Sequence, residues 1–362
     1  MKARLLVIFT SLPEVGGHTT ATLKLCEMLR PTFGRICVVI KDIPGHGFSA
    51  EACGELARTG VHTIRCSGRS AREWWEVATE CRNADVFLAI GMRHLSPVLA
   101  LLIGARQSIY YHITHELNPA TLRQLRIYGG IFSKLVFISP ATSRLYPGRD
   151  GLDAKPEWAL QPTELPRSVA FGTERRTGPI RFGFLGRLTD EKGIGLLAEL
   201  VESSPVPCEL HIAGRGPQEP NLRQCQERRP DRFFFRGAFA AVERGAFLSG
   251  FFSGIDRLCV PSLDDREGIP NVILEALQFG VPVLATRTGG MRSFEMSELG
   301  PADPGVIRLV PPQEFSGAFA ALVSAPPPSA GLREQCRNYF EAHFSDGVLA
   351  IRWRRIFAVF AE

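Results

Sequence analysis

The chain has 362 residues, of which 45% are hydrophobic and 22% are charged. This gives enough length and apolar content for two domains with their own cores, and it excludes disordered and collagen-like proteins. No apolar run approaches the roughly 20 residues that a bilayer crossing requires. The nine cysteines are an odd number without a CxxC pair, which predicts reduced thiols in a cytoplasmic protein and disfavours a disulfide framework or a zinc site.

The charge is uneven along the chain. Residues 1–170 carry 20 Lys+Arg against 14 Asp+Glu, a net +6, whereas residues 171–362 carry 22 against 23. A mildly basic first half suits an anionic partner, such as the inner face of a membrane or a phosphorylated acceptor. An ordinary solvated surface explains the same charge equally well. No run of Lys and Arg is dense enough for a nucleic-acid site.

Strand and helix patterns alternate along the first half. Apolar runs predict strands at 5–9, 36–40, 86–90, 108–112 and 135–138. Amphipathic stretches at 19–30 and 70–81 predict helices between them. Repeated Pro and Gly residues over 147–180 are typical of a connection between domains. The alternation indicates a parallel sheet with helices on both faces.

The same alternation restarts after this connection. Strands are expected at 180–185, 208–213, 233–235, 257–260, 283–285 and 306–309, and a last helix at 349–360. The chain therefore resembles two Rossmann-like α/β domains, and we expect their limits at 1–165 and 178–343, followed by a final segment, 344–362. In such sheets ligands lie at the carboxyl ends of the strands, so the loops at those ends are the candidate sites.

The loop after the first strand contains Gly16 and Gly17, just ahead of the first predicted helix. A glycine pair lets the backbone approach a ligand closely, and a helix N-terminus offers free N–H groups to an anion. The loop matches neither GxGxxG nor a Walker loop, which disfavours a simple NAD or ATP site. A glycine-rich turn without a ligand explains the pair equally well.

The second half opens in the same way, with a strand that leads into the loop 186–193. Lys192 is the only lysine among the 22 basic residues of 171–362 and follows Arg187 by five positions. The two side chains predict a phosphate site, since a guanidinium can fork across two oxygens and an ammonium acts as a point charge. The alternative is two surface charges, one of them paired with Glu191.

A further strand, 208–213, ends in a Gly-Pro turn. Gly214 and Gly216 in this turn fit positions where two backbone segments approach closely. His211 alternates within the strand, which favours a packed side chain over a catalytic one.

The most specific stretch is 261–283, which joins a strand end to a helix expected to begin at Pro270. Glu267 precedes this helix, and Glu275 lies eight positions later, inside it. Carboxylates accept hydrogen bonds from sugar hydroxyls, and free amides at a helix start suit a phosphate. A solvated helix face would also explain Glu275, but its apolar neighbours favour a directed role.

Together these motifs resemble the signature of retaining GT-B glycosyltransferases, specifically glycosyltransferase family 4 (glycosyl transferases group 1). The matching features are Gly16-Gly17, Gly186-Arg187…Glu191-Lys192-Gly193, Ile212-Ala213-Gly214…Gly216-Pro217, Glu267…Glu275 and Gly280-Val281-Pro282-Val283…Gly289-Gly290. The resemblance covers nearly the whole chain and is strong over 180–295. It implies a GT-B fold, in which two Rossmann-like domains face each other across a deep cleft and the last helix packs back on the first domain.

By this resemblance the second domain binds a nucleotide-sugar donor. Arg187 and Lys192 would hold its diphosphate and stabilise the leaving group. Glu275 would bond the ribose, and Glu267 would hold the transferred sugar. The other donor-binding positions that the resemblance implies are Gly16, Gly17, Gly186, Gly214, Arg236, Gly268, Ile269, Pro270 and Asn271.

In the first domain, His115 resembles a catalytic histidine that the family places beside the sugar, and Asn118 would help to position that sugar. His112 is carried by a strand and is expected to be structural. One motif departs from the family: Ser293 stands where a glutamate is usual, and whether Glu295 substitutes for it is left open.

The resemblance implies retaining transfer of a sugar from a UDP- or GDP-sugar to an acceptor hydroxyl, as in the synthesis of bacterial envelope polysaccharide or lipopolysaccharide. The acceptor would be a glycan, a lipid-linked glycan or a small molecule. The sequence has no Asp-x-Asp pair, so Arg187 and Lys192 would replace a divalent metal, and no cofactor is expected. Three alternatives remain open: a nucleotide-sugar epimerase, a sugar phosphorylase or synthase, and a non-catalytic scaffold of the same fold.

Overall fold

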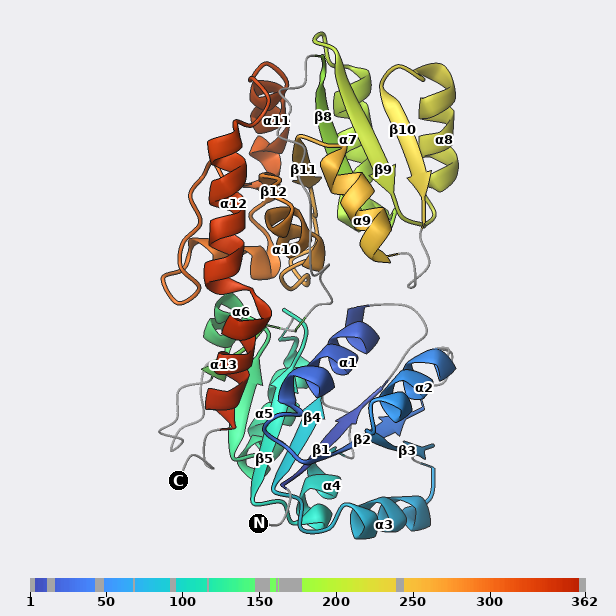
Figure 1. Ribbon diagram of the computed structural model, residues 1–362, viewed down its shortest axis with the longest axis vertical. Coiled ribbons are helices and arrows are strands. Elements are labelled where there is room, and N and C mark those ends of the chain that lie inside the picture. Colours follow the sequence, from blue (N-terminus) through green and yellow to red (C-terminus); the bar gives the residue numbers. More distant parts are fainter. Residues whose placement is uncertain are drawn as a thin grey trace. The chain divides into compact units, whose positions relative to one another are not determined.

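The computed structural model describes residues 4–11, 17–42, 49–67, 69–91, 96–115, 117–146, 157–160, 162, 178–238 and 244–357. The chain forms two compact units (Figure 1). The first unit comprises Met1–Glu164 with Asp346–Glu362, and the second comprises Leu165–Ser345. Each unit is built on its own parallel sheet, and each is described by itself below.

The sheet of the first unit has seven strands in the order β3-β2-β1-β4-β5-β6-β7. The strands are β1 (Leu5–Thr10), β2 (Arg35–Lys41), β3 (His62–Cys66), β4 (Val86–Ile90), β5 (Gln107–His112), β6 (Lys134–Phe137) and β7 (Glu157–Trp158). The strands predicted in this half are confirmed, and β3 and β7 are additional. Both lie at the edges of the sheet, where partial exposure weakens the apolar pattern by which a strand is recognised.

Helices cover both faces of this sheet. They are α1 (Gly17–Leu29), α2 (Ala50–Arg58), α3 (Ala71–Glu80), α4 (Ser96–Ile103), α5 (Pro119–Tyr128), α6 (Pro140–Leu145) and α13 (Asp346–Ile356), with the short 3₁₀ helix η1 (Gly129–Ile131). Because side chains alternate along a strand, β1 sends Leu6 into a core that includes α1, α2 and α13 residues, and Val7 into a core with α3, α4 and α5 residues.

The last helix completes the first core although it follows the second unit in the chain. On α13, Trp353 is fully buried, its Nε1 donates to the carbonyl of Leu160 at 3.1 Å, and its ring meets Tyr111 edge-on at 5.0 Å. The helix begins at Asp346, three residues before the predicted start, and its described part ends at Ile356. It therefore belongs structurally to the first unit.

The sheet of the second unit has six strands in the order β10-β9-β8-β11-β12-β13. They are β8 (Ile180–Leu185), β9 (Cys208–Ala213), β10 (Phe233–Gly237), β11 (Arg257–Val260), β12 (Val283–Thr286) and β13 (Ile307–Val310). The helices are α7 (Ile194–Glu202), α8 (Glu219–Arg228), α9 (Arg244–Ser253), α10 (Asn271–Gln278), α11 (Phe315–Val323) and α12 (Ala330–His343), with the 3₁₀ helices η2 (Asp190–Lys192), η4 (Gly289–Glu295) and η5 (Pro312–Glu314). All six predicted strands are present, the last of them shifted by one residue.

The strand order has a switch point between β8 and β11. The chain continues from β8 to β9 toward one edge of the sheet, and from β11 to β12 toward the other edge. In open parallel sheets the crevice for ligands lies at this point, outside the carboxyl ends of the strands. The loops that follow β8 and β11 are those that contain Lys192 and Glu267. Within the described part of the chain no helix is long and apolar enough to cross a membrane. All nine cysteines are free, and eight of them are buried.

The buried indole of α13 generates a stability prediction. Trp353→Ala should lower the free energy of unfolding of the first unit by about 3–5 kcal/mol, because it leaves a cavity and removes the hydrogen bond to Leu160. All four tryptophans of the chain belong to this unit, so chemical denaturation followed by tryptophan fluorescence reports on it. The control is Ile351→Ala at an exposed position of the same helix, which should change the free energy by less than about 0.5 kcal/mol. Equal effects of the two substitutions would contradict the placement of α13.

Candidate active site

Four loops at the carboxyl ends of β8, β9, β11 and β12 pack together, backbone against backbone. They are joined by main-chain hydrogen bonds of 2.8–3.1 Å: Gly186 N–H to Ala213 C=O, Leu188 N–H to Arg215 C=O, Leu263 N–H to Glu191 C=O and Gly290 N–H to Glu267 C=O. The β8 loop is thereby tied to both the β9 loop and the β11 loop, and the β11 loop to the β12 loop. These contacts form the floor of the candidate site.

Glycines make this packing possible. Gly193 has a φ of +71°, and a Cβ on it would lie 2.0 Å from the carbonyl oxygen of Pro261. At Gly214 a Cβ would lie 1.8 Å from the Gly186 carbonyl oxygen, and at Gly289 it would lie 2.2 Å from that of Glu267. A Cβ on Gly186 itself would meet nothing within 4 Å. Gly214 thus allows the β9 loop to lie close to the β8 loop, as the Gly-Pro turn predicts. Gly186 is the residue of the β8 loop that it contacts.

The floor brings Lys192 and Glu267 together. The Lys192 Nζ forms an ion pair with Glu267 Oε1, and both side chains are largely buried. The second oxygen, Glu267 Oε2, is buried and has no hydrogen-bond partner among the described residues. A buried acceptor without a donor is costly. A ligand hydroxyl would supply the missing donor.

Arg187 stands at the other end of the same loop and is exposed. It pairs with Glu191 at 3.4 Å, so the pairing that the sequence left open is present. Hydrogen bonds from its own backbone and from Thr189, together with the charges of Arg187 and Lys192, lower the pKa of Glu191. An exposed ion pair of this kind contributes at most about 1 kcal/mol, so a bound anion can take Arg187 from Glu191 at little cost.

Glu275 is the most buried carboxylate of the group. It lies inside α10 with 2% of its surface exposed and pairs with the Nη2 of Arg244, the first residue of α9. Burial raises the pKa of Glu275, and the Arg244 charge opposes that rise. The solvated helix face is therefore excluded. Arg244 is a site residue that the sequence reasoning missed, because it belongs to no motif and reaches Glu275 only through the fold.

The helix that carries Glu275 begins one residue later than predicted. Pro270 is the N-cap, and the first helical residue is Asn271. No side chain caps this end within the described residues, which leaves the first amides of α10 available to a ligand. Gly268 and Ile269 precede it and lie against Gly290 of the neighbouring loop.

The Gly-Gly motif of the predicted resemblance lies in η4, with Ser293 at the position where a glutamate was expected. Ser293 is fully buried within η4, whereas the Glu295 carboxylate points to Arg287 at 2.6 Å and is partly exposed. Glu295 therefore does not take the place of the missing side chain at position 293. Asp265 meets this loop instead, because its Oδ1 accepts from the Gly289 amide at 2.8 Å and from Arg292 at 3.0 Å.

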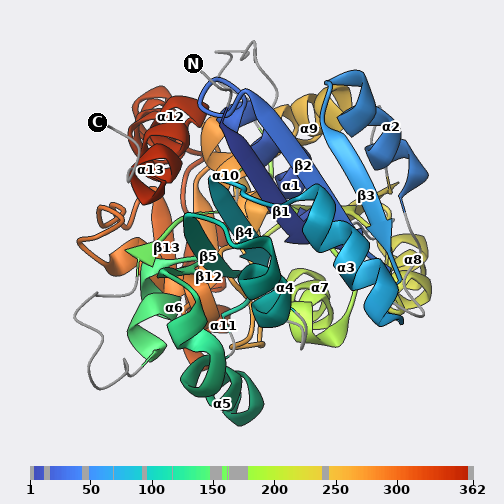
Figure 2. The ribbon, with the colours of Figure 1, turned by 90° about the horizontal axis from the view of Figure 1, so that it is seen from below.

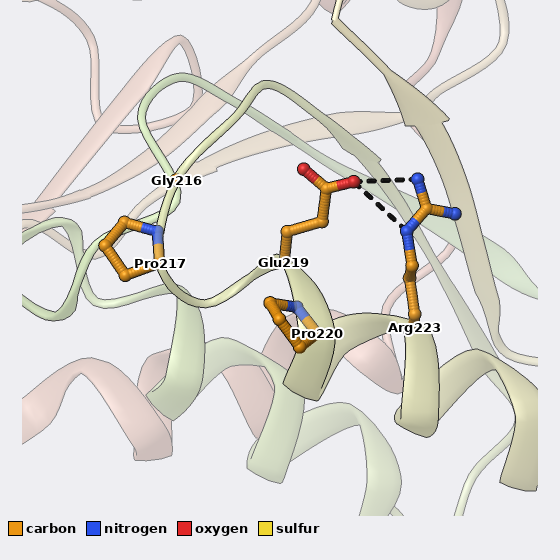
Figure 3. Close-up of a pocket in the computed structure, with 5 residues that line it drawn as sticks. All are labelled: Gly216, Pro217, Glu219, Pro220 and Arg223. Atoms are coloured by element: carbon orange, nitrogen blue, oxygen red, sulfur yellow. Dashed lines mark hydrogen bonds and ion pairs between the residues drawn. The ribbon is translucent and has the colours of Figure 1, made fainter.

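Beside the floor, a shallow groove runs along the start of α8. Figure 3 shows its lining, Gly216, Pro217, Glu219, Pro220 and Arg223, with the Glu219 carboxylate turned to the Arg223 guanidinium at 2.7 Å. The same guanidinium lies 4.5 Å above the ring of Phe235 on β10. The groove thus lies between the Gly-Pro turn after β9 and the first turns of α8.

Arg236, at the end of β10, is exposed and its Nη2 lies 3.1 Å from His211 Nδ1. His211 is buried, its other nitrogen lies 3.0 Å from Glu209, and its ring stacks on Phe234 at 4.8 Å. Burial lowers the pKa of His211, with the Arg236 charge acting in the same direction. His211 is thus packed, as expected, and its position orients Arg236.

The first unit carries the remaining predicted residues. His115 is buried just after β5, and its Nδ1 lies 2.9 Å from the Thr142 hydroxyl. Gly17 is the first residue of α1, and Gly16 lies outside the described residues. The Asn118 side chain accepts from the Thr121 amide at 2.8 Å and caps α5, so the fold accounts for it without a sugar.

His112 is buried with hydrogen-bond partners on both ring nitrogens, the Tyr110 hydroxyl at 2.9 Å and the Thr114 hydroxyl at 3.1 Å. It is therefore structural, as predicted. Among the described residues, no group of three or more His, Cys, Asp and Glu side chains could hold a metal ion. The roles of the donor-site residues stay predictions.

Comparison with known proteins finds similarity within the second unit. Residues 179–325 match the family model described as glycosyl transferases group 1. A GDP-mannose-dependent alpha-mannosyltransferase of Corynebacterium glutamicum is 36% identical over 108 residues, which cover 30% of this chain and 23% of that protein. A putative teichuronic acid biosynthesis glycosyltransferase of Bacillus subtilis is 29% identical over 120 residues, covering 31% and 25%. This chain therefore spans about a quarter of the length of these two curated relatives.

Solved structures extend the likeness to the whole fold. The structure of HepE of Anabaena in complex with UDP has a TM-score of 0.74 at 16% identity and covers 99% of this chain and 100% of that one. The apo form of the lipopolysaccharide outer core galactosyltransferase WaaB has a TM-score of 0.72 at 14% identity, covering 99% and 100%. The predicted fold class, two Rossmann-like units of the GT-B type, is confirmed.

The glycine floor generates a matched pair of substitutions. Gly193→Ala should lower the free energy of unfolding of the second unit by roughly 2–4 kcal/mol, because it combines a left-handed φ with a clash against the Pro261 carbonyl. Gly195→Ala, two residues along in α7, meets nothing within 4 Å and should be neutral or stabilising by up to about 1 kcal/mol. Thermal unfolding followed by circular dichroism compares them. Similar losses for both variants would show that the loop contact is not required.

Proposed function

We propose that this chain, whose residues 179–325 match the family model of glycosyl transferases group 1 and whose fold is of the GT-B type, is a glycosyltransferase acting on a nucleoside-diphosphate sugar. The observation that carries the proposal is the largely buried pair of Lys192 and Glu267 at the switch point of the second sheet, with one carboxylate oxygen that has no donor among the described residues. It supplies a cation for a phosphate and an acceptor for a sugar hydroxyl at one place.

In the proposed reaction the donor diphosphate lies against Arg187 and Lys192. The bond between the anomeric carbon and the β-phosphate oxygen breaks, and the electron pair stays with the diphosphate. Preorganised cations stabilise the charge that develops on this leaving group. The acceptor hydroxyl forms the new bond to the anomeric carbon on the same face, with retention, and its proton passes to the departing phosphate oxygen. No divalent metal and no cofactor takes part in this proposal.

The carboxylates would hold the uncharged parts of the donor. Glu267 would accept a hydrogen bond from a hydroxyl of the transferred sugar, and Glu275 from a ribose hydroxyl. Glu275 is already paired with Arg244, so donor binding requires Arg244 to share this carboxylate or to turn toward the phosphates. The amides at the start of α10 and Gly186, Gly214 and Arg236 would complete the donor contacts, and His115 and the Gly16-Gly17 loop would act from the first unit.

The relatives support a role in envelope polysaccharide synthesis without fixing the donor. The names of the similar proteins include teichuronic acid biosynthesis and lipopolysaccharide outer core synthesis. UDP and UDP-glucose are bound in structures of HepE, whereas the mannosyltransferase is GDP-mannose-dependent. We therefore propose a UDP- or GDP-sugar as donor, and a glycan, lipid-linked glycan or small-molecule hydroxyl as acceptor.

A second candidate is a synthase that acts on a soluble glucan. A glycogen synthase of Alkalilimnicola ehrlichii is 31% identical over 157 residues, which cover 42% of this chain and 30% of that protein. The two functions share the donor chemistry and differ in the acceptor. Transfer of radiolabelled glucose from UDP-glucose can be measured with glycogen and with lipid-linked glycans as acceptors. Only a synthase is expected to extend the soluble glucan.

Nucleotide binding tests the donor site. In calorimetric titrations with UDP, GDP and ADP in the absence of divalent metal, at least one nucleotide should bind the wild-type protein. Glu275→Ala should weaken that binding by about 10–100-fold, because it removes charged hydrogen bonds to the ribose. Glu227→Ala is the control. It lies near the C-terminal end of α8, at the opposite edge of the sheet from the loops, and should bind as the wild type does.

Failure of all three nucleotides to bind, or a requirement for magnesium, would overturn the cation-pair site. Binding that Glu275→Ala leaves unchanged would overturn the ribose role of Glu275 and leave the rest of the donor site standing.

Sugar transfer tests the leaving-group role of Lys192. Lys192→Ala should lower kcat by about 10²–10³-fold, which is the effect of losing one preorganised group that stabilises developing charge. Release of nucleoside diphosphate in the presence of acceptor measures the rate. Arg228→Ala serves as the control, because Arg228 is exposed on α8 and pairs with Glu202. A Lys192→Ala rate within a few-fold of the wild type, at an unchanged thermal midpoint, would refute the assignment.

A further inference from the structure

Arg244 stands at a position that its own helix does not favour. It is the first residue of α9, and the first turn of this helix has no acidic residue. The dipole of a helix favours anions at its N-terminus and disfavours cations there. The side chain is also only about a quarter exposed. The ion pair with Glu275 of α10 is what offsets these costs.

The two oxygens of the Glu275 carboxylate have different surroundings. Oε1 accepts a hydrogen bond from the Nη2 of Arg244. No hydrogen bond from a described residue reaches Oε2. An ionised carboxylate is an acceptor at both of its oxygens. Oε2 is therefore available to a hydroxyl donor while Oε1 stays with the guanidinium.

Packing between the two helices fixes the position of this pair. Figure 2 shows α9 and α10 on one side of the second sheet and α7 and α11 on the other. Phe252 of α9 stacks on Phe279, which follows α10, with the ring centres 5.1 Å apart, and both rings are buried. The helices thus meet at two points along their length, the aromatic stack and the ion pair. Arg244 is held beside Glu275 by the fold.

The charge of Arg244 acts directly on the buried carboxylate. Burial raises the pKa of Glu275, and the Arg244 guanidinium opposes that rise. A guanidinium stays charged even when it is partly buried, so it is a permanent counter-charge. Lys192 and Glu267, in the neighbouring loops, are paired with each other.

Other titratable groups on the elements that pack against α10 face elsewhere. These elements are α12, β11 and β12. On α12 the nearest arginines, Arg333 and Arg337, lie beyond the C-terminal end of α10. On β11, Arg257 and Cys259 alternate with the residues that face α10, and Cys259 belongs to the core on the opposite face. The strand β12 has no titratable residue. Within the described part of the chain, Arg244 is therefore the charge that acts on the carboxylate.

We propose that Arg244 is a positioning residue for ribose recognition: it holds the Glu275 carboxylate as an anion and fixes it through Oε1, so that Oε2 accepts the ribose hydroxyl. This role rests on the proposed function, since it takes the ribose of a nucleotide as the ligand. Arg244 thereby stays with the carboxylate when the donor binds and does not turn toward the phosphates.

Ribose preference tests this role. UDP and GDP are each compared with their 2′,3′-dideoxy forms in calorimetric titrations, and the ratio of the two dissociation constants is the ribose preference. The wild type should bind the ribonucleotide about 10–100-fold more tightly, the effect of hydrogen bonds to a charged group. Arg244→Met should reduce the preference to a few-fold and leave the affinity for the dideoxy form within a few-fold of the wild type. Arg244→Lys should keep part of the preference, because it keeps the charge.

The pH dependence of the preference is a readout that a merely structural contact would not move. Glu275 accepts most strongly as a carboxylate, so the preference is lost as the pH falls through the pKa of Glu275. Without Arg244 nothing opposes the effect of burial, and that pKa rises further. The midpoint of the loss should therefore lie at higher pH in Arg244→Met than in the wild type. Both forms of the nucleotide carry the same diphosphate, so its own titration cancels in the ratio.

Arg333→Met is the matched control. Arg333 is 27% exposed, against 26% for Arg244, and pairs with Asp256 at 3.1 Å. Asp256 directly precedes β11, at the end of the sheet remote from the donor loops. This variant should lower the thermal midpoint about as much as Arg244→Met does and leave the ribose preference unchanged.

A double variant keeps the test decisive if Arg244→Met does not fold. Arg244→Met combined with Glu275→Gln replaces the ion pair by neutral groups and should regain the thermal midpoint of the wild type. Its remaining ribose preference should no longer depend on pH, because the glutamine amide does not titrate.

Three results would overturn the role of Arg244. The first is an unchanged ribose preference in Arg244→Met. The second is an equal weakening of both nucleotide forms, which would assign Arg244 to the diphosphate, and the third is the same pH midpoint in Arg244→Met and the wild type. Each of these leaves nucleotide binding, and so the proposed function, standing. Failure of both UDP and GDP to bind the wild type would instead overturn the proposed function and this role with it.

Discussion

The candidate site depends on the close approach of main-chain segments that glycine alone permits. Gly193 lies against the Pro261 carbonyl, Gly214 against that of Gly186, and Gly289 against that of Glu267. These contacts hold the loops after β8, β9, β11 and β12 against one another at the carboxyl end of the sheet. Lys192 and Glu267, which are 75 positions apart in the chain, meet because of them. A single Cβ at any of the three glycines would separate two loops, and the charges that the loops carry would separate with them.

The charged side chains of the site form pairs of opposite charge. Lys192 pairs with Glu267, and Arg244 pairs with Glu275. Of the four groups Glu275 is the most deeply buried, so its pairing with Arg244 offsets most of the cost of placing a carboxylate in the interior of the second unit. A diphosphate adds negative charge that only the cations can meet. The carboxylates are then available to accept hydrogen bonds from neutral hydroxyls. A nucleotide sugar requires both kinds of contact, because it has charged phosphates and uncharged sugar hydroxyls.

The sequence predicts those parts of this arrangement that have a local signature. Strands in the centre of each sheet were recognisable because both faces are apolar, and the glycines, Lys192, Glu267 and Glu275 stand in loops or helices at predictable strand ends. Arg244 was missed because its partner, Glu275, is reached through tertiary packing that no spacing encodes. For Asn118 the sequence suggests a ligand contact, whereas the structure shows the N-cap of a helix. A polar residue just before a helix can fill either role, so the sequence does not distinguish them. Lys192 and Glu267 were assigned separate roles, and only the structure shows that they share an ion pair.

The distribution of the proposed site residues follows from how the chain is divided. The residues proposed to hold the donor come mainly from the second unit, whereas His115 and the Gly16-Gly17 loop belong to the first. Because α13 returns to the first core after the second unit is complete, the chain passes between the units twice, near residues 165 and 346. Two chain segments, rather than one, therefore connect the second unit to the first.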